Sequence, residues 1–252
     1  MLQTLINWSN ANSGFLSLLI FAITMLFGWV SGIFRNLMQK PKFRLELIPG
    51  PTLCTAVATG KQYKEHHVHR TAFSLYLKVA NIGSAPASID NIEAAFHWNL
   101  TPISWLWIRY RLFWYWVPHP VISMEAFQYD FGGSIKVYPS LLQANSVTGG
   151  VADTYLEVGQ STNGVVYFEH DDSWGGCFPA PTANGNTKIR VVVVDSFHNK
   201  YKKTFLVPIV SWAEARKYNP SFGGTFATIR SDENLTDLYE TLNNQVNKDA
   251  SR

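Results

Sequence analysis

The feature that most constrains the fold is an uncharged stretch over residues 14–34, "GFLSLLIFAITMLFGWVSGIF". As a helix, its 21 residues would span about 30 Å, which is the thickness of the hydrocarbon core of a bilayer. A helix can cross lipid because it satisfies its own backbone polar groups. The stretch is long for a signal peptide, and no basic residue precedes it. The sequence therefore predicts a single transmembrane helix.

The charges on either side of this stretch predict its orientation. Residues 1–13 contain no lysine or arginine, whereas a basic cluster follows the stretch, namely Arg35, Lys40, Lys42 and Arg44. Positive residues are retained on the cytoplasmic side of a membrane. We therefore expect a short extracytoplasmic tail over 1–13 and a basic juxtamembrane linker over 35–42 that lies against anionic headgroups. The rest of the chain should be cytoplasmic, in a single-pass protein of the cell membrane.

Residues 43–210 have the pattern of a β domain. Phe73, Leu75, Leu77 and Val79 alternate with polar residues, which is typical of a strand with one buried face. Similar short runs occupy 43–48, 71–83, 84–98, 163–170, 187–197 and 200–210. Consecutive strands without intervening helices indicate an antiparallel sandwich. We predict a mainly β protein with an immunoglobulin-like β-sandwich.

The C-terminal region, 211–252, is predicted to be partly helical and partly irregular. A short helix is expected over 211–218, and a second helix is expected to begin with Ser231 as its N-cap. The second helix carries a narrow apolar stripe made of Leu235, Leu238, Leu242 and Val246. This stripe either docks on the sandwich or mediates homo-oligomer formation with a second copy.

An aromatic insertion over 101–120 interrupts the β pattern. Its centre, "WLWIRYRLFWYW" at 105–116, holds seven aromatic residues in twelve positions. A helix from 102 to about 116 and a strand are both compatible with this sequence. Only 15% of the chain is charged, against a usual value of about 25%, so some apolar surface should face something other than water.

Three locations compete for this aromatic segment: the core, the membrane interface and a protein interface. Tryptophan and tyrosine favour the headgroup region, and tryptophan, tyrosine and arginine dominate binding hot spots. The residues expected to contact the membrane or a partner are Trp105, Trp107, Arg109, Tyr110, Arg111, Phe113, Trp114 and Trp116.

Two polar segments are weak candidates for chemistry. In "KEHHVHR" (64–70), His67 and His69 would share a strand face and form a weak metal-binding pair. In "EHDDSWGGC" (169–177), which is expected to be an exposed loop, Trp174, Asp171 and Asp172 are possible ligand contacts. The two cysteines, Cys54 and Cys177, form no zinc-binding spacing. We expect no catalytic residue, no bound metal and no cofactor.

The function expected from the sequence is non-enzymatic. The chain lacks the glycine-rich nucleotide-binding motifs, and its net charge of +3 is too small to indicate nucleic-acid binding. We expect a membrane-anchored protein that contacts the lipid bilayer and binds a ligand or another membrane-associated protein, as a scaffold, sensor or complex subunit. The alternatives are an effector that oligomerises on binding a cytosolic ligand and a hydrolase-like enzyme that uses the 169–177 loop.

Overall fold

A computed structural model describes residues 7–8, 11–32, 39–98, 105, 108, 114–142, 152–224 and 236–250. The N-terminal helix α2 (Ser13–Val30) is long and apolar enough to cross a membrane, judged by its length and composition. None of its residues is buried, so it contributes nothing to the core of the protein. The predicted apolar helix is therefore confirmed over most of 14–34. The basic residue Arg35 lies outside the described residues.

The first β-sheet is built around the long strand β3 (His66–Asn81). β9 (Ser161–Trp174) pairs with β3 over nearly its whole length. On the other side of β3, β1 (Phe43–Leu47) pairs with its C-terminal part and β2 (Leu53–Tyr63) with its N-terminal part. A two-residue strand, β12 (Thr236–Asp237), pairs with β2. All of these pairings are antiparallel, as the sequence predicted, but β2 and its hairpin with β3 were not predicted.

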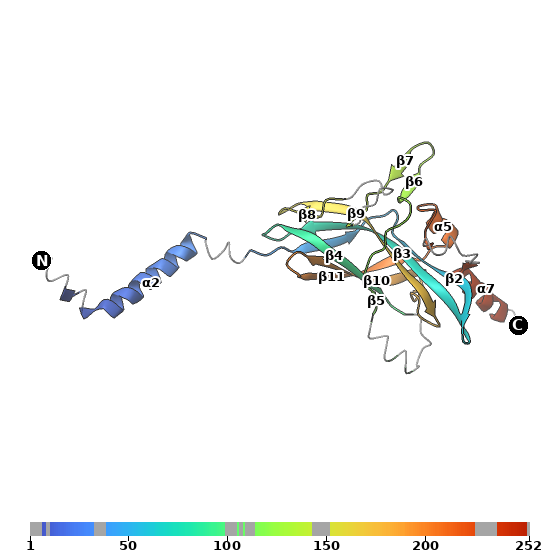
Figure 1. Cartoon of the computed structure of the whole chain (residues 1–252), viewed down its shortest axis with the longest axis horizontal. Coiled ribbons are helices and arrows are strands. Elements are labelled where there is room, and N and C mark those ends of the chain that lie inside the picture. Colours follow the sequence, from blue (N-terminus) through green and yellow to red (C-terminus); the bar gives the residue numbers. More distant parts are fainter. Residues whose placement is uncertain are drawn as a thin grey trace.

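The second sheet has the order β11–β10–β4, and two short strands pair with the free edge of β4. Its members are β4 (Ala87–Phe96), β5 (Tyr115–Val117), β8 (Tyr155–Leu156), β10 (Asn186–Asp195) and β11 (Lys200–Pro208). These pairings are also antiparallel. A separate hairpin is formed by β6 (Gln128–Asp130) and β7 (Ile135–Val137). Figure 1 shows the two sheets stacked along a common long axis.

One apolar core contains residues from both sheets. The side chains predicted to share one face of β3 are all fully buried in it. The second sheet contributes Ile92, Ala94, Phe96, Ile189, Val191 and Val193. Burial of each large apolar side chain stabilises the fold by roughly 1.5–3 kcal/mol. The alternation in the sequence therefore identified the face on which the sheets pack.

The opposite face of the first sheet is covered by a layer that the sequence did not reveal. Phe127, Tyr138 and Phe222 pack over Tyr76 and Tyr167, which point away from the main core. These covering residues come from the segments 118–142 and 209–224, which include the short helix α5 (Trp212–Arg216). Ser211 caps α5, because its side chain accepts a hydrogen bond from the backbone N–H of Glu214. The additional layer explains where part of the apolar content is buried.

The chain joins the β domain at Lys40, two residues before the end of the predicted linker. The backbone N–H of Ser84 donates to the carbonyl of Lys40 (3.0 Å), and that of Ile82 donates to the carbonyl of Lys42 (2.8 Å). The buried side chain of Asn81 also accepts a hydrogen bond from the Gly83 N–H (3.0 Å). Gly83 is required for this approach, since a Cβ there would lie 2.5 Å from the Lys40 carbonyl oxygen. We call this end of the domain the tether end.

The C-terminal helix α7 (Leu238–Ala250) begins later than predicted. Asp237 caps it, because its carboxylate accepts hydrogen bonds from the N–H groups of Tyr239 (3.0 Å) and Glu240 (3.2 Å). The helix does not run from Ser231 as predicted, since Thr236–Asp237 pairs as a strand with β2 directly before α7. Ser231 itself and Leu235 lie outside the described residues, as does the side chain of Val246.

Two further local predictions need correction. The segment expected to form an exposed loop at 169–177 continues β9 as far as Trp174, because pairing with β3 extends to Val68. The alternative of a helix running to about residue 116 is wrong at its end, since Tyr115–Val117 pairs with β4 as β5. In both places tertiary pairing overrides the local sequence preference.

Candidate functional site

Three segments singled out in the sequence meet at the distal end of the domain, by which we mean the tip of the β2–β3 hairpin and the adjoining end of β9. The histidine-rich segment 64–70 forms that hairpin, and the acidic segment 169–177 runs along the end of β9. The aromatic segment 105–116 ends in β5, next to the end of β4. The 16 residues of β3 place this end about 50 Å along the strand from Asn81, at ~3.3 Å per residue.

An exposed group of rings lies at the distal end, and we call Tyr63, His66 and Trp174 the distal aromatic group. The ring centroid of Trp174 is 5.4 Å from that of Tyr63 and 5.8 Å from that of His66, and the His66 ring is stacked at 18°. Trp174 is 51% exposed and Tyr63 is 47% exposed. Tyr63 and His66 lie on the paired strands β2 and β3, and Trp174 lies on β9, which pairs with β3. The rings are therefore presented to solvent by a rigid support.

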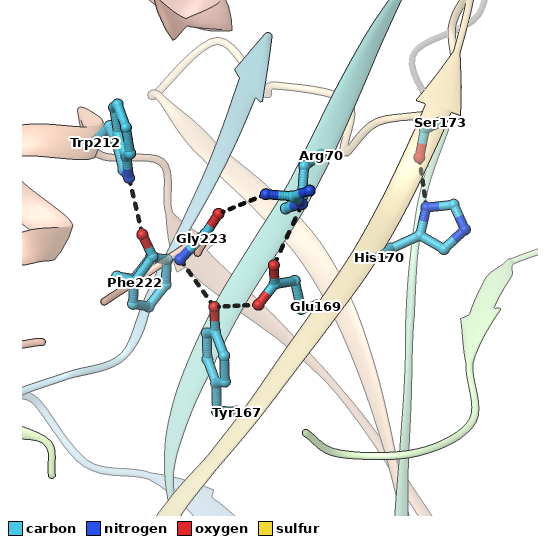
Figure 2. A network of polar contacts seen from close by, with 8 residues as sticks. All are labelled: Arg70, Tyr167, Glu169, His170, Ser173, Trp212, Phe222 and Gly223. Atoms are coloured by element: carbon cyan, nitrogen blue, oxygen red, sulfur yellow. Dashed lines mark hydrogen bonds and ion pairs between the residues drawn. The ribbon is translucent and has the colours of Figure 1, made fainter. Parts of the chain in front are cut away.

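A β-bulge in β9 orients the polar residues beneath these rings. His69 pairs with Ser173 and Thr71 pairs with His170, so β9 contains one more residue than β3 between the two pairs. An extra residue in one strand changes the direction in which the neighbouring side chains point. His170 and Ser173, three positions apart, therefore lie on one face and hydrogen-bond each other (Figure 2). The backbones of Asp171 and Asp172 form the bulge, but their side chains lie outside the described residues.

His170 also connects the bulge to the aromatic segment. Its Nε2 atom hydrogen-bonds the hydroxyl of Tyr115, and the two rings meet edge-on with centroids 4.7 Å apart. Tyr115 in turn packs against Phe96 (5.2 Å) and Trp98 (5.0 Å). This contact could not be predicted from the sequence, since Tyr115 and His170 are separated by 55 positions.

Cys177 lies beside this polar cluster as a protonated thiol. Burial raises the pKa of Cys177 to about 11, although hydrogen bonds with Ser173 and Tyr115 act in the opposite direction. A thiol with such a pKa is a weak nucleophile at neutral pH, since the thiolate is the reactive form. Cys54 is fully buried, and burial raises the pKa of its thiol as well.

The weak metal-binding pair is not assembled. His69 is buried and its Nε2 lies 2.9 Å from the carbonyl oxygen of Cys177, whereas His67 is exposed. Within the described ranges, no three histidine, cysteine, aspartate or glutamate side chains form a group that could hold a metal ion.

Glu169 is occupied in a buried network rather than exposed in a loop (Figure 2). Its carboxylate lies 3.3 Å from Nε of Arg70, with the two side chains only 2% and 4% exposed. It also accepts a hydrogen bond from the hydroxyl of Tyr167 (2.9 Å). Burial and the nearby Glu169 raise the pKa of Tyr167 well above its ordinary value, so this hydroxyl stays a donor.

The same network fastens the outer layer to the sheet. The Gly223 N–H donates to the Tyr167 hydroxyl (2.9 Å), and the Arg70 guanidinium donates to the Gly223 carbonyl (3.1 Å). The Trp212 indole donates to the carbonyl of Phe222 (2.8 Å). Arg70 and Glu169 therefore have a structural role, and the carboxylate is not available as a general base at the surface.

The aromatic segment is described only in part. Trp105 and Trp116 are exposed, whereas Trp114 lies under the guanidinium of Arg190, 4.2 Å from its ring centroid. The predicted contact residues Trp107, Arg109, Tyr110, Arg111 and Phe113 lie outside the described residues. Trp98, which precedes the segment, and Trp114, near the end of the segment, stand at the end of β4 that is remote from Lys40.

The described residues at the distal end form an aromatic surface supported by a satisfied polar cluster. No known protein family matches the chain, and no curated protein shows significant sequence similarity to it. Chemically, the arrangement can stack on a partner's side chain or on a planar ligand, and it holds its thiol in the unreactive form.

The buried histidine of the cluster predicts a pH-dependent stability. Burial lowers the pKa of His69 below its ordinary value of 6.5. Below pH 6.5 the unfolded chain therefore binds a proton that the folded chain does not, and stability falls by up to about 1.4 kcal/mol per pH unit until the folded pKa is reached. His69→Gln should reduce this loss, as measured by urea unfolding at neutral pH and near pH 5. An equal loss in the variant would contradict the assignment to His69.

Proposed function

We propose that the protein is a single-pass membrane protein whose β domain lies in the cytoplasm. The length and apolar composition of α2 support the membrane span. The basic residues after the helix support the orientation, and Lys40, Lys42 and Arg44 are all exposed on the domain surface.

A reporter fused to the C-terminus tests this orientation. A cytoplasm-dependent reporter should be active and an export-dependent reporter should be inactive, because the basic residues keep the C-terminal side of the helix inside. Replacing Arg35, Lys40, Lys42 and Arg44 with neutral residues should lower the activity of the cytoplasmic reporter. Activity of the export-dependent fusion in the unmodified chain would reject the proposed orientation.

We further propose that the β domain is immunoglobulin-like. In constant-type immunoglobulin domains, one sheet contains strands in the order A–B–E and the other has the order C–F–G. Here β1 and β2 pair with one edge of β3, and β9 pairs with its other edge. In the second sheet, β10 lies between β4 and β11. This order matches if β1 with β2 is strand A, β3 is B, β4 is C, β9 is E, β10 is F and β11 is G. The two free cysteines depart from the disulfide-linked antibody pattern.

The proposed activity is non-enzymatic binding of a partner next to the membrane, through the distal end of the domain. The observation that carries it is the distal aromatic group, in which a half-exposed tryptophan is stacked on a histidine and supported by paired strands. Aromatic residues on a rigid surface are typical of binding hot spots. We propose that the aromatic segment 105–116 extends this surface toward the same partner, since Tyr115 near its end contacts His170 of β9.

The structure offers less support for the two alternative functions. The hydrolase-like reading required an exposed acidic loop, but Glu169 is buried with Arg70 and Cys177 is a protonated thiol. The stripe on the last helix, which was the candidate contact for a homo-oligomer, is partly used within the chain, since Leu238 and Leu242 pack with Ala56 and Phe178.

Photo-crosslinking from the distal end tests the partner proposal. A photoreactive residue at Trp174 or Tyr63 should give one specific protein adduct in cells, and the same residue at Leu206 should not. Leu206 is a matched control because it is a large apolar residue that is exposed on another strand. Trp174→Ala should weaken capture of that partner by about tenfold or more, which is typical of a hot-spot residue. Equal adducts from all three positions would reject the distal end as the binding surface.

A further inference from the structure

The tether end gathers three turns around the point where the chain enters the domain. The turn after β3 is bonded to the Lys40–Lys42 segment. The turn between β8 and β9 is bonded to the first, because the Gly159 N–H donates to the carbonyl of Asn81 (2.9 Å). The β10–β11 turn is held to the same segment by Tyr201, whose hydroxyl lies 2.8 Å from the carbonyl oxygen of Pro41. Figure 1 shows the starts of β4 and β11 at this end of the domain.

Each of these turns carries one exposed apolar side chain at its tip. Ile82 is 48% exposed, Val158 is 55% exposed and Phe197 is 63% exposed. We call these three residues the apolar tips. Single exposed apolar residues are ordinary on protein surfaces, but three on neighbouring turns at one end of the domain indicate an interaction surface.

The apolar tips are held in place by hydrogen bonds within their turns. The carboxylate of Asp195 accepts hydrogen bonds from the N–H groups of Phe197 (2.8 Å) and Asn199 (2.9 Å). The Glu157 N–H donates to the side chain of Gln160 (2.9 Å), which closes the turn that carries Val158. These side chains are therefore presented to solvent by fixed turns, so little conformational entropy is lost when they are buried by a partner.

Basic residues surround the apolar tips. Lys40 and Lys42 are exposed on the incoming chain. Arg44 and Lys78 line a depression of about 360 Å³ that also contains Ile82 and Val158. Three acidic residues reduce the positive charge: Glu46 lies 3.1 Å from Arg44, Glu157 is exposed on its turn, and Asp195 lies in the turn that carries Phe197. The remaining excess is positive, and anionic headgroups complement it.

We propose that the tether end docks on the anionic surface of the bilayer, with the apolar tips inserted among the headgroups and the basic residues against the phosphates. This inference rests on the proposed membrane anchor. Only five residues lie between Phe34, at the end of the apolar stretch, and Lys40, so the six residue steps span at most about 21 Å of extended chain. The tether end is consequently the part of the domain closest to the membrane, and apolar side chains with nearby cations favour the interface.

Docking in this way fixes the orientation of the domain. The strands would stand away from the membrane, and the distal aromatic group would lie about 50 Å along β3 from the docked turns. The tether end would then contact lipid, and the distal end would be left for the proposed partner.

The inference is tested by measuring membrane depth with spin labels on the full chain in liposomes that contain anionic lipid. Labels are attached to single cysteines at Ile82, Val158 and Phe197, in a background in which Cys177 is replaced by serine. Matched control labels are placed at Leu206 and Trp174, which are also exposed. Collisions with oxygen, which concentrates in lipid, are compared with collisions with a water-soluble nickel complex.

The expected result is an oxygen-to-nickel collision ratio at the apolar tips that is several-fold higher than at the two control positions. Exchanging the anionic lipid for a neutral one, or raising the salt from about 0.15 M to about 1 M, should lower that ratio because the attraction to headgroups is screened. If the ratios at the apolar tips equal those at the controls while the chain still floats with the liposomes, docking is refuted and the anchor stands. If the chain does not float with the liposomes, both proposals fall.

Discussion

Removal of residues 1–38 is expected to transfer the protein almost completely from the membrane pellet to the supernatant after ultracentrifugation. Helix α2 has no buried residue, so its removal exposes no core surface of the β domain. The domain begins its own hydrogen bonding at Lys40, which the truncated chain retains. The transfer should therefore occur without unfolding. The far-ultraviolet circular dichroism spectrum of the truncated chain should be that of a folded β protein.

A subtler variant controls for the loss of chain length. Leu19 and Ile23 are exposed on α2, and replacing both with arginine places two charges near the middle of the span. Each charge costs about 2.5–3.5 kcal/mol at the centre of a membrane helix, so the variant should also leave the membrane fraction. If the full-length protein is found in the supernatant without detergent, the helix is not a membrane anchor and the proposed function is wrong.

Breaking the pair between Arg70 and Glu169 is expected to cause the largest loss of stability among the changes considered. Arg70→Met leaves a buried carboxylate without its cation, and Glu169→Gln leaves a buried guanidinium without its anion. Removing one partner of a buried pair costs about 3–5 kcal/mol, which is a large part of the roughly 5–15 kcal/mol that stabilises a typical domain. The loss would be measured by urea unfolding of the domain freed from residues 1–38.

An exposed pair supplies the matched control. Arg44 and Glu46 lie 3.1 Å apart, with side chains that are 57% and 42% exposed. Arg44→Met should therefore cost less than about 1 kcal/mol. The double variant of Arg70→Met with Glu169→Gln should cost less than the sum of the two single changes, because neither charge is then left alone. If Arg70→Met costs no more than Arg44→Met, the buried network does not stabilise the fold.

The sheet structure could be predicted where one face of a strand meets the core. The alternation of Phe73, Leu75, Leu77 and Val79 identified β3, and the turn residues before Lys200 separated β10 from β11. β2 was missed because its second half, which includes Gly60 and Lys61, is polar and extends into solvent. The covering layer was missed because its aromatic residues lie in irregular segments without a period.

The candidate site could not be predicted because it depends on strand register. Nothing in the segment 169–177 indicates that Glu169 faces Arg70, since that contact follows from the pairing of β9 with β3. The segment was assigned to a loop because Asp171, Asp172 and Gly175 are typical of turns, whereas the bulge at Asp171–Asp172 changes which face each later residue of β9 occupies. The sequence identified all three segments that meet at the distal end, but their meeting follows only from the pairing of long strands.

The register of β1 against β3 has a mechanical consequence. Five residue pairs join these strands, from Phe43 with Asn81 to Leu47 with Leu77. A force between an anchored helix and a partner held near Trp174 would run parallel to β3. The hydrogen bonds between β1 and β3 would then be loaded in shear, so all of them would resist the force together instead of breaking one after another. The register of β1 with β3 would therefore resist tension along the length of the domain, between the proposed anchor and the proposed partner.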